Sequence, residues 1–397
     1  MEKELIAIRR YLHENAEVGF SVDKTKGFIE ERLREIGYMP KKCGKAGIVV
    51  TVGRGRKRVL LRADIDGLPI EEKTGLSYAC KNGNMHACGH DMHATMLLGA
   101  AKLLKEKEEE LDGEIRLLFQ PAEELLEGAK NCIEDGVLDG VHAACMLHCL
   151  TAIDLPAGSV IVSSEGITAP AADFFEVEIL GKSCHGSAPW KGVDALTVAA
   201  RVLLGFEELS ARELSTASPA VLTVGALRTG EVQNALTDRA VLRGTLRAFD
   251  EQTRSFVKKR LEKIAKSIAV AFRARARIRY GGGCPTLIND GRISRLAEKV
   301  AKGVVGENFT FTSNELNGDI RKNSGGSEDF AYIAQSVPSV MLGLAAGERS
   351  KGFVYPLHHP KVRFDEGILG VGAVLYADMG RALLAFLSKN AEEETGK

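Results

Sequence analysis

A short segment of the chain, Met85–His93, concentrates side chains that bind metal ions. It holds three histidines, one cysteine and one aspartate. Cys88 and His90 are two residues apart, so both can face one point only where the backbone is extended or turns, and Gly89 supplies that freedom. Thiolate and imidazole are ligands that zinc and related divalent ions prefer. The segment indicates a metal-binding turn; the alternative is an ordinary buried polar loop, because cysteine and histidine are often buried without binding anything.

Two neighbouring carboxylates, Glu123 and Glu124, follow an apolar run at 114–120. Adjacent residues of an extended segment point in opposite directions, so the two carboxylates can have different roles. One can bind a metal ion while the other takes a proton from a water molecule that the metal activates. The alternative is a charged helix N-terminus, where glutamate is favoured because of its negative charge.

Further histidines stand near the ends of later apolar runs. His148 follows the run 141–147, and His358 and His359 lie near the C-terminus. A lone histidine is more often a structural residue, but the carboxyl ends of neighbouring strands meet at the edge where open α/β sheets bind ligands. On that topology a mixed ligand set suited to a pair of divalent ions would come from Cys88, His90, Glu124, His148 and one of His358 and His359.

Another histidine, His185, lies in a loop rich in glycine and serine, Gly181–Pro189. If the domain that carries this loop closes over the cleft, His185 can donate a hydrogen bond to a developing oxyanion. The alternative is a surface loop histidine without a role in chemistry. No GxSxG elbow, phosphate-binding GxxxxGK[ST] loop or HExxH helix occurs in the sequence, so those mechanisms are not indicated.

The elements that must position these residues alternate between strands and helices in the first part of the chain. Near-continuous apolar runs predict the strands, and helical periodicity predicts the helices. This alternation is typical of a mainly parallel α/β sheet covered on both faces. Strands are expected at 46–52, 58–64, 114–120 and 141–147, and helices at 2–14, 23–37, 94–109 and 127–135.

A different pattern fills the region between about 170 and 283. Its order is strand, helix, two strands, helix and strand, which is the ferredoxin-like βαββαβ arrangement. Helices at 291–303 and 365–388 and a strand at 337–344 then return to α/β character. We therefore expect a discontinuous metal-binding domain, 1–170 and 284–397, with an inserted domain at 171–283. The inserted strands are expected at 173–180, 220–227, 240–247 and 275–280, and the helices at 191–212 and 251–270.

The composition is that of a globular protein of two domains. The chain has 397 residues, with 45% hydrophobic and 27% charged residues, and a length above about 250–300 residues usually divides. A net charge of zero gives no reason to expect a nucleic-acid or membrane partner. The N-terminus does not resemble a signal peptide, and no apolar run is expected to be long enough to span a bilayer. Eight scattered cysteines are typical of reduced thiols, so we expect a cytoplasmic location.

Taken together, these segments resemble the dinuclear-metal amidohydrolases of the aminoacylase and carboxypeptidase family. The nearest branch contains hippurate hydrolases, N-acyl-amino-acid amidohydrolases and indole-acetyl-amino acid hydrolases. Each motif is weak alone, but the ordered set is specific and covers nearly the whole chain. The matching segments are Leu12–Glu14, Glu17–Phe20, Leu61–Pro69, Cys88–His93, Phe119–Glu124, Gly181–His185, Asn234, Gly326–Phe330 and His358–Pro360.

The resemblance implies a metal centre with two divalent ions per subunit, of which Zn, Mn, Co and Ni all suit the ligands. Glu123 would be the general base that takes a proton from water, and His185 would polarise the substrate carbonyl. The implied ligands are Cys88, His90, Glu124, His148 and His358.

Four more positions have implied or expected roles. Asn234 would contact the substrate, and Asp66 matches a supporting aspartate of the family. Asp91 and His93 are expected to support the ligands from behind. The inserted domain would be a lid that commonly mediates dimers, so a homodimer or higher homo-oligomer is expected.

The implied activity is hydrolysis of the amide bond of an N-acyl amino acid. Alternatives are a metallo-carboxypeptidase or dipeptidase acting on small peptides, a catalytically silent metal-binding homologue, and a thiol-based redox sensor at Cys88. Ala16 replaces the usual proline, Trp190 stands where the branch often has histidine, and the segment after Asn234 lacks a proline. None of these departures affects an implied ligand, but they leave the acyl group and the amino acid open.

Overall fold

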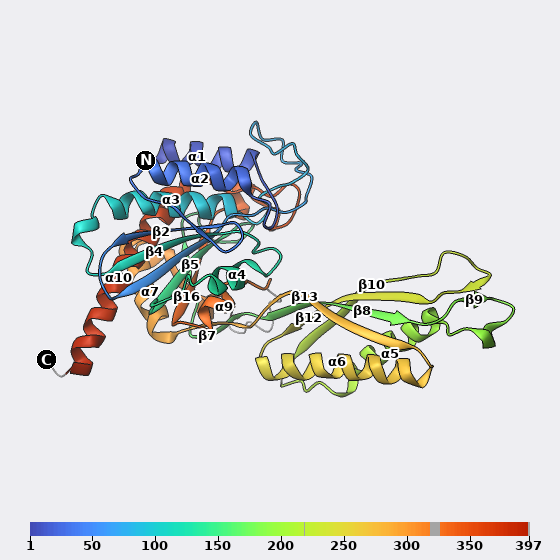
Figure 1. Cartoon of the computed structure of the whole chain (residues 1–397). Coiled ribbons are helices and arrows are strands. Elements are labelled where there is room, and N and C mark those ends of the chain that lie inside the picture. The colour runs from blue at the N-terminus through green and yellow to red at the C-terminus, as the bar shows by residue number, and fades with distance from the viewer. Residues whose placement is uncertain (218, 318–325, 396–397) are drawn as a thin grey trace. The chain divides into compact units, whose positions relative to one another are not determined.

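The structure is a computed structural model that describes residues 1–217, 219–317 and 326–395 (Figure 1). It divides into two compact units. Unit 1 comprises Met1–Thr168, Ile288–Asp319 and Glu328–Lys397, and unit 2 comprises Ala169–Leu287 and Ile320–Ser327. The division lies close to the expected boundaries at 170 and 284. That the inserted segment acts as a lid or dimerisation domain remains a prediction.

The sheet of unit 1 has eight strands within the described residues, in the order β1-β2-β4-β3-β5-β16-β6-β15. Its centre, β4-β3-β5-β16, is parallel, which confirms the predicted α/β class. Towards the edges, β2 pairs with β1 and β4, and β6 with β16, in antiparallel register. The strands are β1 Lys41–Cys43, β2 Gly47–Gly53, β3 Arg58–Asp64, β4 Glu114–Gln120, β5 Ala143–Leu150, β6 Val160–Val162, β15 Thr310–Thr312 and β16 Ser339–Ala345.

Helices pack on this sheet in two groups (Figure 1). In the first group α3 contacts α10, β3 and β5, while α1 and α2 pack on α3 and α7 packs on α10. In the second group α4 and α9 contact each other, and they contact β4 and β16 respectively. The helices are α1 Glu2–Glu14, α2 Asp23–Glu35, α3 His90–Lys105, α4 Gly128–Glu134, α7 Gly291–Val305, α9 Ala331–Ala334 and α10 Leu369–Thr395.

The helix α3 explains why the metal-binding turn is followed by small apolar residues. Its first residue is His90, four residues before the expected start at 94, because Gly89 adopts a positive φ of 87° and turns the chain directly into the helix. Gly99 of α3 lies so close to Ala373 of α10 that an added Cβ would come within 2.7 Å of the alanine methyl. Small residues therefore allow α3 to lie against α10 in the core of unit 1.

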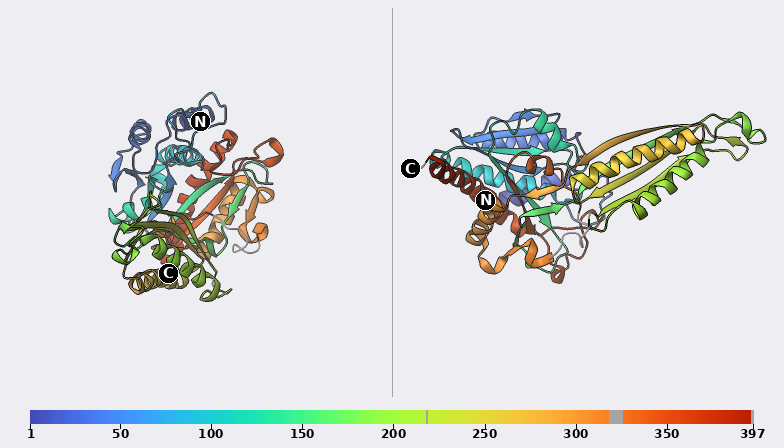
Figure 2. Two further views of the ribbon diagram at one scale, coloured as in Figure 1. Left: turned by 90° about the vertical axis from the view of Figure 1, so that its right-hand side faces the viewer. Right: turned by 90° about the horizontal axis from the view of Figure 1, so that it is seen from below.

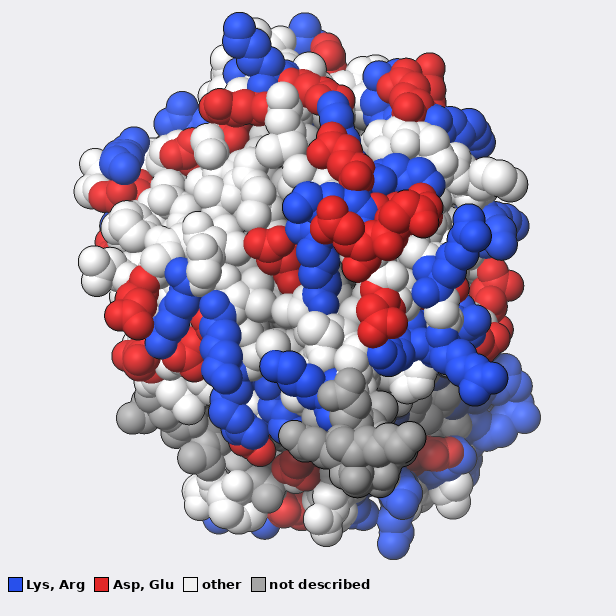
Figure 3. All heavy atoms as spheres, turned by 90° about the vertical axis from the view of Figure 1, so that its left-hand side faces the viewer, with Lys and Arg blue, Asp and Glu red and all other residues white. Residues whose placement is uncertain are grey.

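The segment Glu366–Lys389 corrects the expectation that no run is long enough to span a bilayer. The segment is long enough for a membrane span and contains an 18-residue window with a mean hydropathy of 1.5, but 61% of that window is buried inside the structure. It forms most of α10, which packs on α3 and α7, and a core helix has the same composition. On the face of the molecule in Figure 3, acidic and basic side chains are interspersed.

Unit 2 has the predicted βαββαβ order. Its sheet is antiparallel throughout, with the order β10-β12-β8-β13, and α5 and α6 cover one face (Figure 2). The helix expected at 191–212 begins at Ala195, because the side chain of Asp194 accepts a hydrogen bond from the Leu196 N–H and caps it. The elements are β8 Ala171–Leu180, α5 Ala195–Arg212, β10 Ala220–Thr229, β12 Arg239–Ala248, α6 Glu251–Ala271 and β13 Arg275–Cys284.

Candidate metal centre

The parallel strands β3, β4 and β5 bring the candidate residues to one edge of the sheet. Asp64 and Gln120, the last residues of β3 and β4, are paired in register. The chain then continues to Asp66 after β3 and to Glu123 and Glu124 after β4. Because all these positions follow the carboxyl ends of parallel strands, the edge is where an open α/β sheet binds a ligand.

The five implied ligands form overlapping groups at this edge. Cys88 Sγ lies 3.6 Å from His148 Nε2, and His358 Nε2 lies 3.4 Å from Glu124 Oε1. His90 Nε2 is 3.9 Å from Glu124 Oε1, so it connects the two sides of the site. The ligand atoms of each group lie within 4.8 Å of one another; the groups are Cys88, His90 and His148; Cys88, Glu124 and His358; and His90, Glu123 and Glu124.

The hydrogen bonds of the histidines show which nitrogen faces the group. His90 Nδ1 donates to the Asp66 carbonyl at 2.8 Å, and His148 Nδ1 donates to the Cys149 carbonyl at 2.8 Å. His90 Nε2 and Glu124 Oε1 are buried and have no hydrogen-bond partner among the described residues. A buried nitrogen and a buried carboxylate oxygen that both lack a hydrogen bond lower the stability of a protein interior. These residues therefore fit a pair of divalent ions.

Electrostatics favour the ligand form of Cys88. Burial alone would raise the pKa of its thiol, but His148 and hydrogen bonds from His358 and His90 lower it to about 6. The thiolate is the form that binds metals. The pKa of His148 is correspondingly raised to about 9, because the effect of the Cys88 thiolate exceeds that of burial.

Glu123 has the environment of a general base. Its side chain is 5% exposed, and burial together with the nearby Glu328 and Glu124 raises its pKa well above the usual value. The carboxylate of Asp66 accepts the backbone N–H groups of Glu123 at 3.0 Å and Glu124 at 3.3 Å. Asp66 therefore orients both carboxylates and, through its carbonyl, His90.

Two residues of the motif, Asp91 and His93, have partners of their own behind the group. His93 Nδ1 donates to Asp64 at 2.5 Å, and its Nε2 accepts the Cys149 N–H at 2.8 Å. Asp91 accepts a hydrogen bond from His13 Nδ1 at 2.8 Å, and Arg9 Nε lies 2.8 Å from the same oxygen. Asp91 therefore connects α1 to α3; that it supports the ligands remains a prediction.

The structure separates the adjacent histidines His358 and His359. His358 has a positive φ of 65° and is the one that lies in the ligand group. The ring of His359 stacks on Tyr355 with centroids 4.4 Å apart, and its Nδ1 accepts the Lys361 N–H. Residue spacing left both histidines open, and only the family resemblance implied His358.

A buried network around Arg62 has no counterpart among the predicted roles. The guanidinium is fully buried and lies 2.7 Å from Asp64, 2.7 Å from Asp329 and 3.1 Å from Glu328. The signal in the sequence is an arginine in the middle of the apolar run of β3, because a buried charge must be paired. Its partners at 328 and 329 are far away in sequence and could not be assigned from spacing.

The two candidates in unit 2, His185 and Asn234, lie next to each other. His185 ends β9, Cys184–His185, which pairs with β11, Ala235–Leu236. The Gly186 N–H donates to the Asn234 carbonyl at 2.7 Å, and His185 Nδ1 is hydrogen-bonded to Ser187 at 2.7 Å. Both side chains are exposed. Strands of two residues have no periodicity, so the sequence did not predict this pair.

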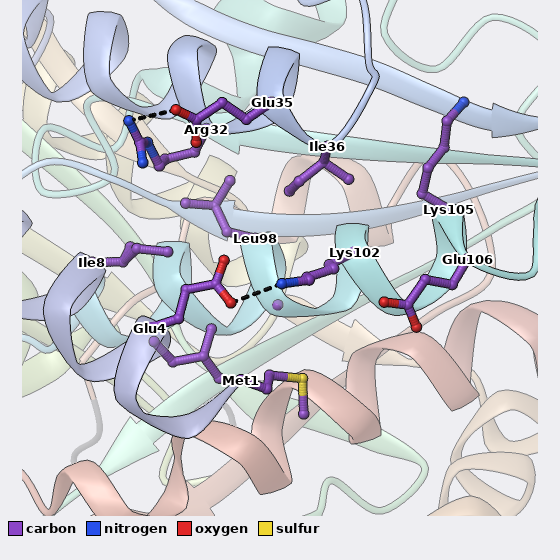
Figure 4. A pocket seen from close by; sticks show the side chains of 12 residues that line it. Met1, Glu4, Ile8, Arg32, Glu35, Ile36, Leu98, Lys102, Lys105 and Glu106 are labelled. Atoms are coloured by element: carbon purple, nitrogen blue, oxygen red, sulfur yellow. Dashed lines mark hydrogen bonds and ion pairs between the residues drawn. The ribbon is translucent and has the colours of Figure 1, made fainter.

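A separate pocket lies between α1, α2 and α3 (Figure 4). Its volume is about 320 Å³, and its floor contains Ile8, Ile36 and Leu98. Four of its charged residues form two ion pairs of 2.8 Å, Lys102 with Glu4 and Arg32 with Glu35. It contains none of the residues that the sequence singled out for chemistry.

Comparison with known proteins identifies the family of this arrangement. The model of Peptidase family M20/M25/M40 matches residues 60–381. N-acetyl-L-cysteine deacetylase of Bacillus subtilis (strain 168) is 38% identical over 96% of this chain and 89% of its own length. The hippurate hydrolase of Campylobacter jejuni is 32% identical over 96% of both chains.

Two further relatives are named as peptidases. Thermostable carboxypeptidase 1 of Saccharolobus solfataricus is 33% identical over 95% of this chain and 94% of its own length. A crystal structure described as a dinuclear metal binding peptidase from the M20 family of Bacillus subtilis has a TM-score of 0.77 and 30% identity, and covers 97% of this chain and 98% of that one.

Proposed function

The chain belongs to Peptidase family M20/M25/M40 and is an amide-bond hydrolase; on this premise we propose that it is a metal-dependent amidohydrolase that releases an amino acid from an N-acyl amino acid. The single observation that carries the proposal is the meeting of His90 Nε2 and Glu124 Oε1, both buried and without a hydrogen bond among the described residues, beside the buried carboxylate of Glu123. Relatives named as a deacetylase of N-acetyl-L-cysteine and a hippurate hydrolase support this substrate class.

In the proposal, five residues hold a pair of divalent ions at the edge of the sheet. When bound, such ions supply Lewis acidity that polarises an amide carbonyl and lowers the pKa of water towards neutrality. The metals remain open among Zn, Mn, Co and Ni, because thiolate, imidazole and carboxylate suit them all. The holding residues are Cys88, His90, Glu124, His148 and His358.

Glu123 is the proposed general base. Its carboxylate takes a proton from the attacking water and then gives that proton to the leaving amine, so one residue serves both half-reactions. The raised pKa supports this cycle, because a carboxyl group that holds its proton more tightly can accept one at neutral pH. Asp66 keeps the carboxylate oriented by accepting the N–H of Glu123.

His185 and Asn234 are the proposed contacts to the substrate. His185 donates a hydrogen bond to the oxyanion that develops when water attacks the carbonyl. Asn234 directly precedes β11, and its carbonyl accepts the Gly186 N–H, so it lies beside His185 at one end of this strand pair. Their exposure supports a role with an incoming small molecule rather than a role in folding.

A metallo-carboxypeptidase or dipeptidase acting on small peptides is the second candidate function. The 33% identity to the carboxypeptidase of Saccharolobus solfataricus favours it. Both functions use the same metal centre and general base; they differ in whether the group before the scissile amide is an acyl group or an amino acid. A catalytically silent homologue is disfavoured, because Glu123 and all five ligands are present.

Location and assembly complete the proposal. All eight cysteines are free thiols, which supports a cytoplasmic location. A homodimer or higher homo-oligomer through unit 2 is supported by β10, an edge strand of its sheet that exposes Val221 and Leu227, because an unpaired strand edge favours pairing with a second chain.

A hydrolysis screen tests the proposed function. The protein is loaded with Zn, Mn, Co or Ni and offered N-acetyl, N-benzoyl and indole-acetyl amino acids together with dipeptides, and the released amino acid is measured. We expect activity on the N-acyl compounds that a chelator removes and metal restores. Turnover of dipeptides alone would favour the second candidate, and turnover that survives complete metal removal would contradict both.

Substitution of the thiolate tests the ligand set separately. Cys88→Ala is expected to lower the metal content after dialysis, whereas Cys145→Ala, which removes a buried thiol of β5, leaves it unchanged. A ligand contributes more than a supporting residue, so a loss of metal affinity of at least about 100-fold is expected. Elemental analysis that finds equal metal in both variants would remove Cys88 from the set.

A further inference from the structure

The loop that carries the general base is unusually constrained. It runs from Pro121, directly after β4, to Gly128, the first residue of α4. Two of its residues, Ala122 with φ 59° and Leu126 with φ 55°, adopt the left-handed region that residues with a Cβ rarely occupy. Such a conformation persists only where the surrounding structure holds it, so the loop requires contacts that fix its course.

The two ends of this loop approach each other very closely. A Cβ added at Gly128 would lie 1.8 Å from the Pro121 carbonyl oxygen and 2.7 Å from Gln120 Nε2. The Gly128 N–H donates to the Ala122 carbonyl at 3.2 Å, and the Leu126 N–H donates to the Glu123 carbonyl at 2.7 Å. The loop is therefore a closed turn whose shape depends on how its two ends are joined.

The side chain of Asp329 joins these ends. Its carboxylate accepts Gln120 Nε2 at 2.8 and 3.0 Å from the residue before the loop, and the Ala129 N–H at 2.8 Å from the residue after it. Arg62 Nη2 donates to it at 2.7 Å, and the side chain is fully buried. Every partner is a donor, so a carboxylate satisfies all four contacts and an amide cannot.

The backbone of the same residue reaches the general base. The Asp329 N–H donates to Glu123 Oε1 at 3.4 Å. We propose that Asp329 is a positioning residue that clamps the loop Pro121–Gly128 at both ends and so holds the Glu123 carboxylate in place. The inference rests on the proposed function for its effect on catalysis, but the clamp itself is a property of the fold.

The substitution Asp329→Asn tests the clamp in the full-length, metal-loaded protein. The Nδ2 group of the new asparagine would face hydrogen-bond donors and could not accept from them. The loop should therefore lose its hydrogen bond at one end and become more mobile there. We expect hydrogen–deuterium exchange of the peptide 121–130 to become at least about 10-fold faster. With an N-acyl amino acid as substrate, kcat should fall by about 10- to 100-fold with KM within about twofold, because a small misplacement of a catalytic group affects the transition state most.

A matched control is available in unit 2. Asp173 is also a buried carboxylate with cationic partners, Arg254 and Lys258. Asp173→Asn should not accelerate exchange in 121–130. If Asp329→Asn fails to fold, Gln120→Met removes one donor to the clamp and should give the same changes to a smaller extent.

The outcomes separate the clamp from the proposed function. Exchange in 121–130 that stays at the wild-type rate in both variants would overturn the clamp, and so would a loss of kcat that added metal restores. A wild-type protein that hydrolyses no N-acyl amino acid would contradict the proposed function, and the exchange rates would still decide whether Asp329 fixes the loop.

Discussion

The metal-binding edge of unit 1 and the His185 loop of unit 2 hold the two halves of the proposed chemistry, and they are built in opposite ways. At the edge, Asp64, Asp66 and His90 are at most 1% exposed. His90 donates a hydrogen bond to the Asp66 carbonyl, and Asp64 accepts one from His93. In the loop, His185 is exposed, and Trp190 directly after the loop is 71% exposed. The fold orients the first set without a substrate, whereas the role proposed for the second set depends on what it contacts during the reaction.

This difference predicts how substitutions should behave. A change at the edge should alter metal binding or stability together with activity, because each buried polar group is a hydrogen-bond partner of its neighbours. A change in the loop should alter activity alone, since exposed side chains contribute little to stability.

The largest effect is expected from Glu123→Gln. The amide cannot take a proton, so kcat should fall by about 10²- to 10⁴-fold, while metal content stays at the wild-type value because Glu123 is not a proposed ligand. The measurement is steady-state hydrolysis with elemental analysis of the same sample. Turnover close to that of the wild type would refute the assigned base.

The next effect is expected from His185→Ala. Loss of one donor to an oxyanion costs about 10²- to 10³-fold in kcat, and the thermal midpoint and metal content should not change. Thermal unfolding and metal analysis beside the kinetics would detect any loss of structure. A drop in metal content would show that the loop is part of the metal-binding side and would break the comparison.

A smaller effect on activity, but a larger one on structure, is expected from His93→Gln. This residue contacts Asp64 and the Cys149 N–H rather than the substrate. Loss of such support typically lowers metal affinity by about 10- to 100-fold, and the unpaired Asp64 oxygen should cost about 1–3 kcal/mol of unfolding free energy. Metal titration and chemical denaturation measure the two changes; wild-type values for both would place His93 outside the site.

The smallest effect is expected from Trp190→His. The side chain is mostly exposed, so the unfolding free energy should change by less than about 0.5 kcal/mol. KM for N-benzoyl and N-acetyl substrates should shift unequally if this residue lies beside the acyl group. Equal KM changes for both substrates would remove Trp190 from the determinants of specificity.

Local patterns in the sequence were sufficient for most of the fold. Apolar runs located β3 and β4, and helical periodicity located α1 and α6, because these elements bury one face or both. The short strands β6 and β15 were missed, since three residues carry too little periodicity to be recognised. The antiparallel pairing of β2 with β4 was also not predicted, because strand direction follows from connections rather than from composition.

For the site, the sequence predicted which residues take part better than it predicted their contacts. Cys88, His90 and Glu124 were identified from chemistry and from their place after strands, and the structure brings them together. The choice of His358 over His359 depends on a backbone angle, and the contact of Arg62 with Asp329 joins residues that are distant in the chain. Neither is encoded in spacing: the family resemblance implied His358, and the Arg62 contact required the structure.

The position of β16 has a consequence for synthesis of the protein. This strand lies between β5 and β6 in the sheet, and His358 follows it in the chain. A ribosome that adds about 5–20 residues per second needs roughly 10 to 40 s to pass from the end of β5 to the start of β16. During that time almost all of unit 2 is synthesised, while the edge of β5 that will pair with β16 has no partner strand. The nascent chain is therefore vulnerable to aggregation until its last segments arrive.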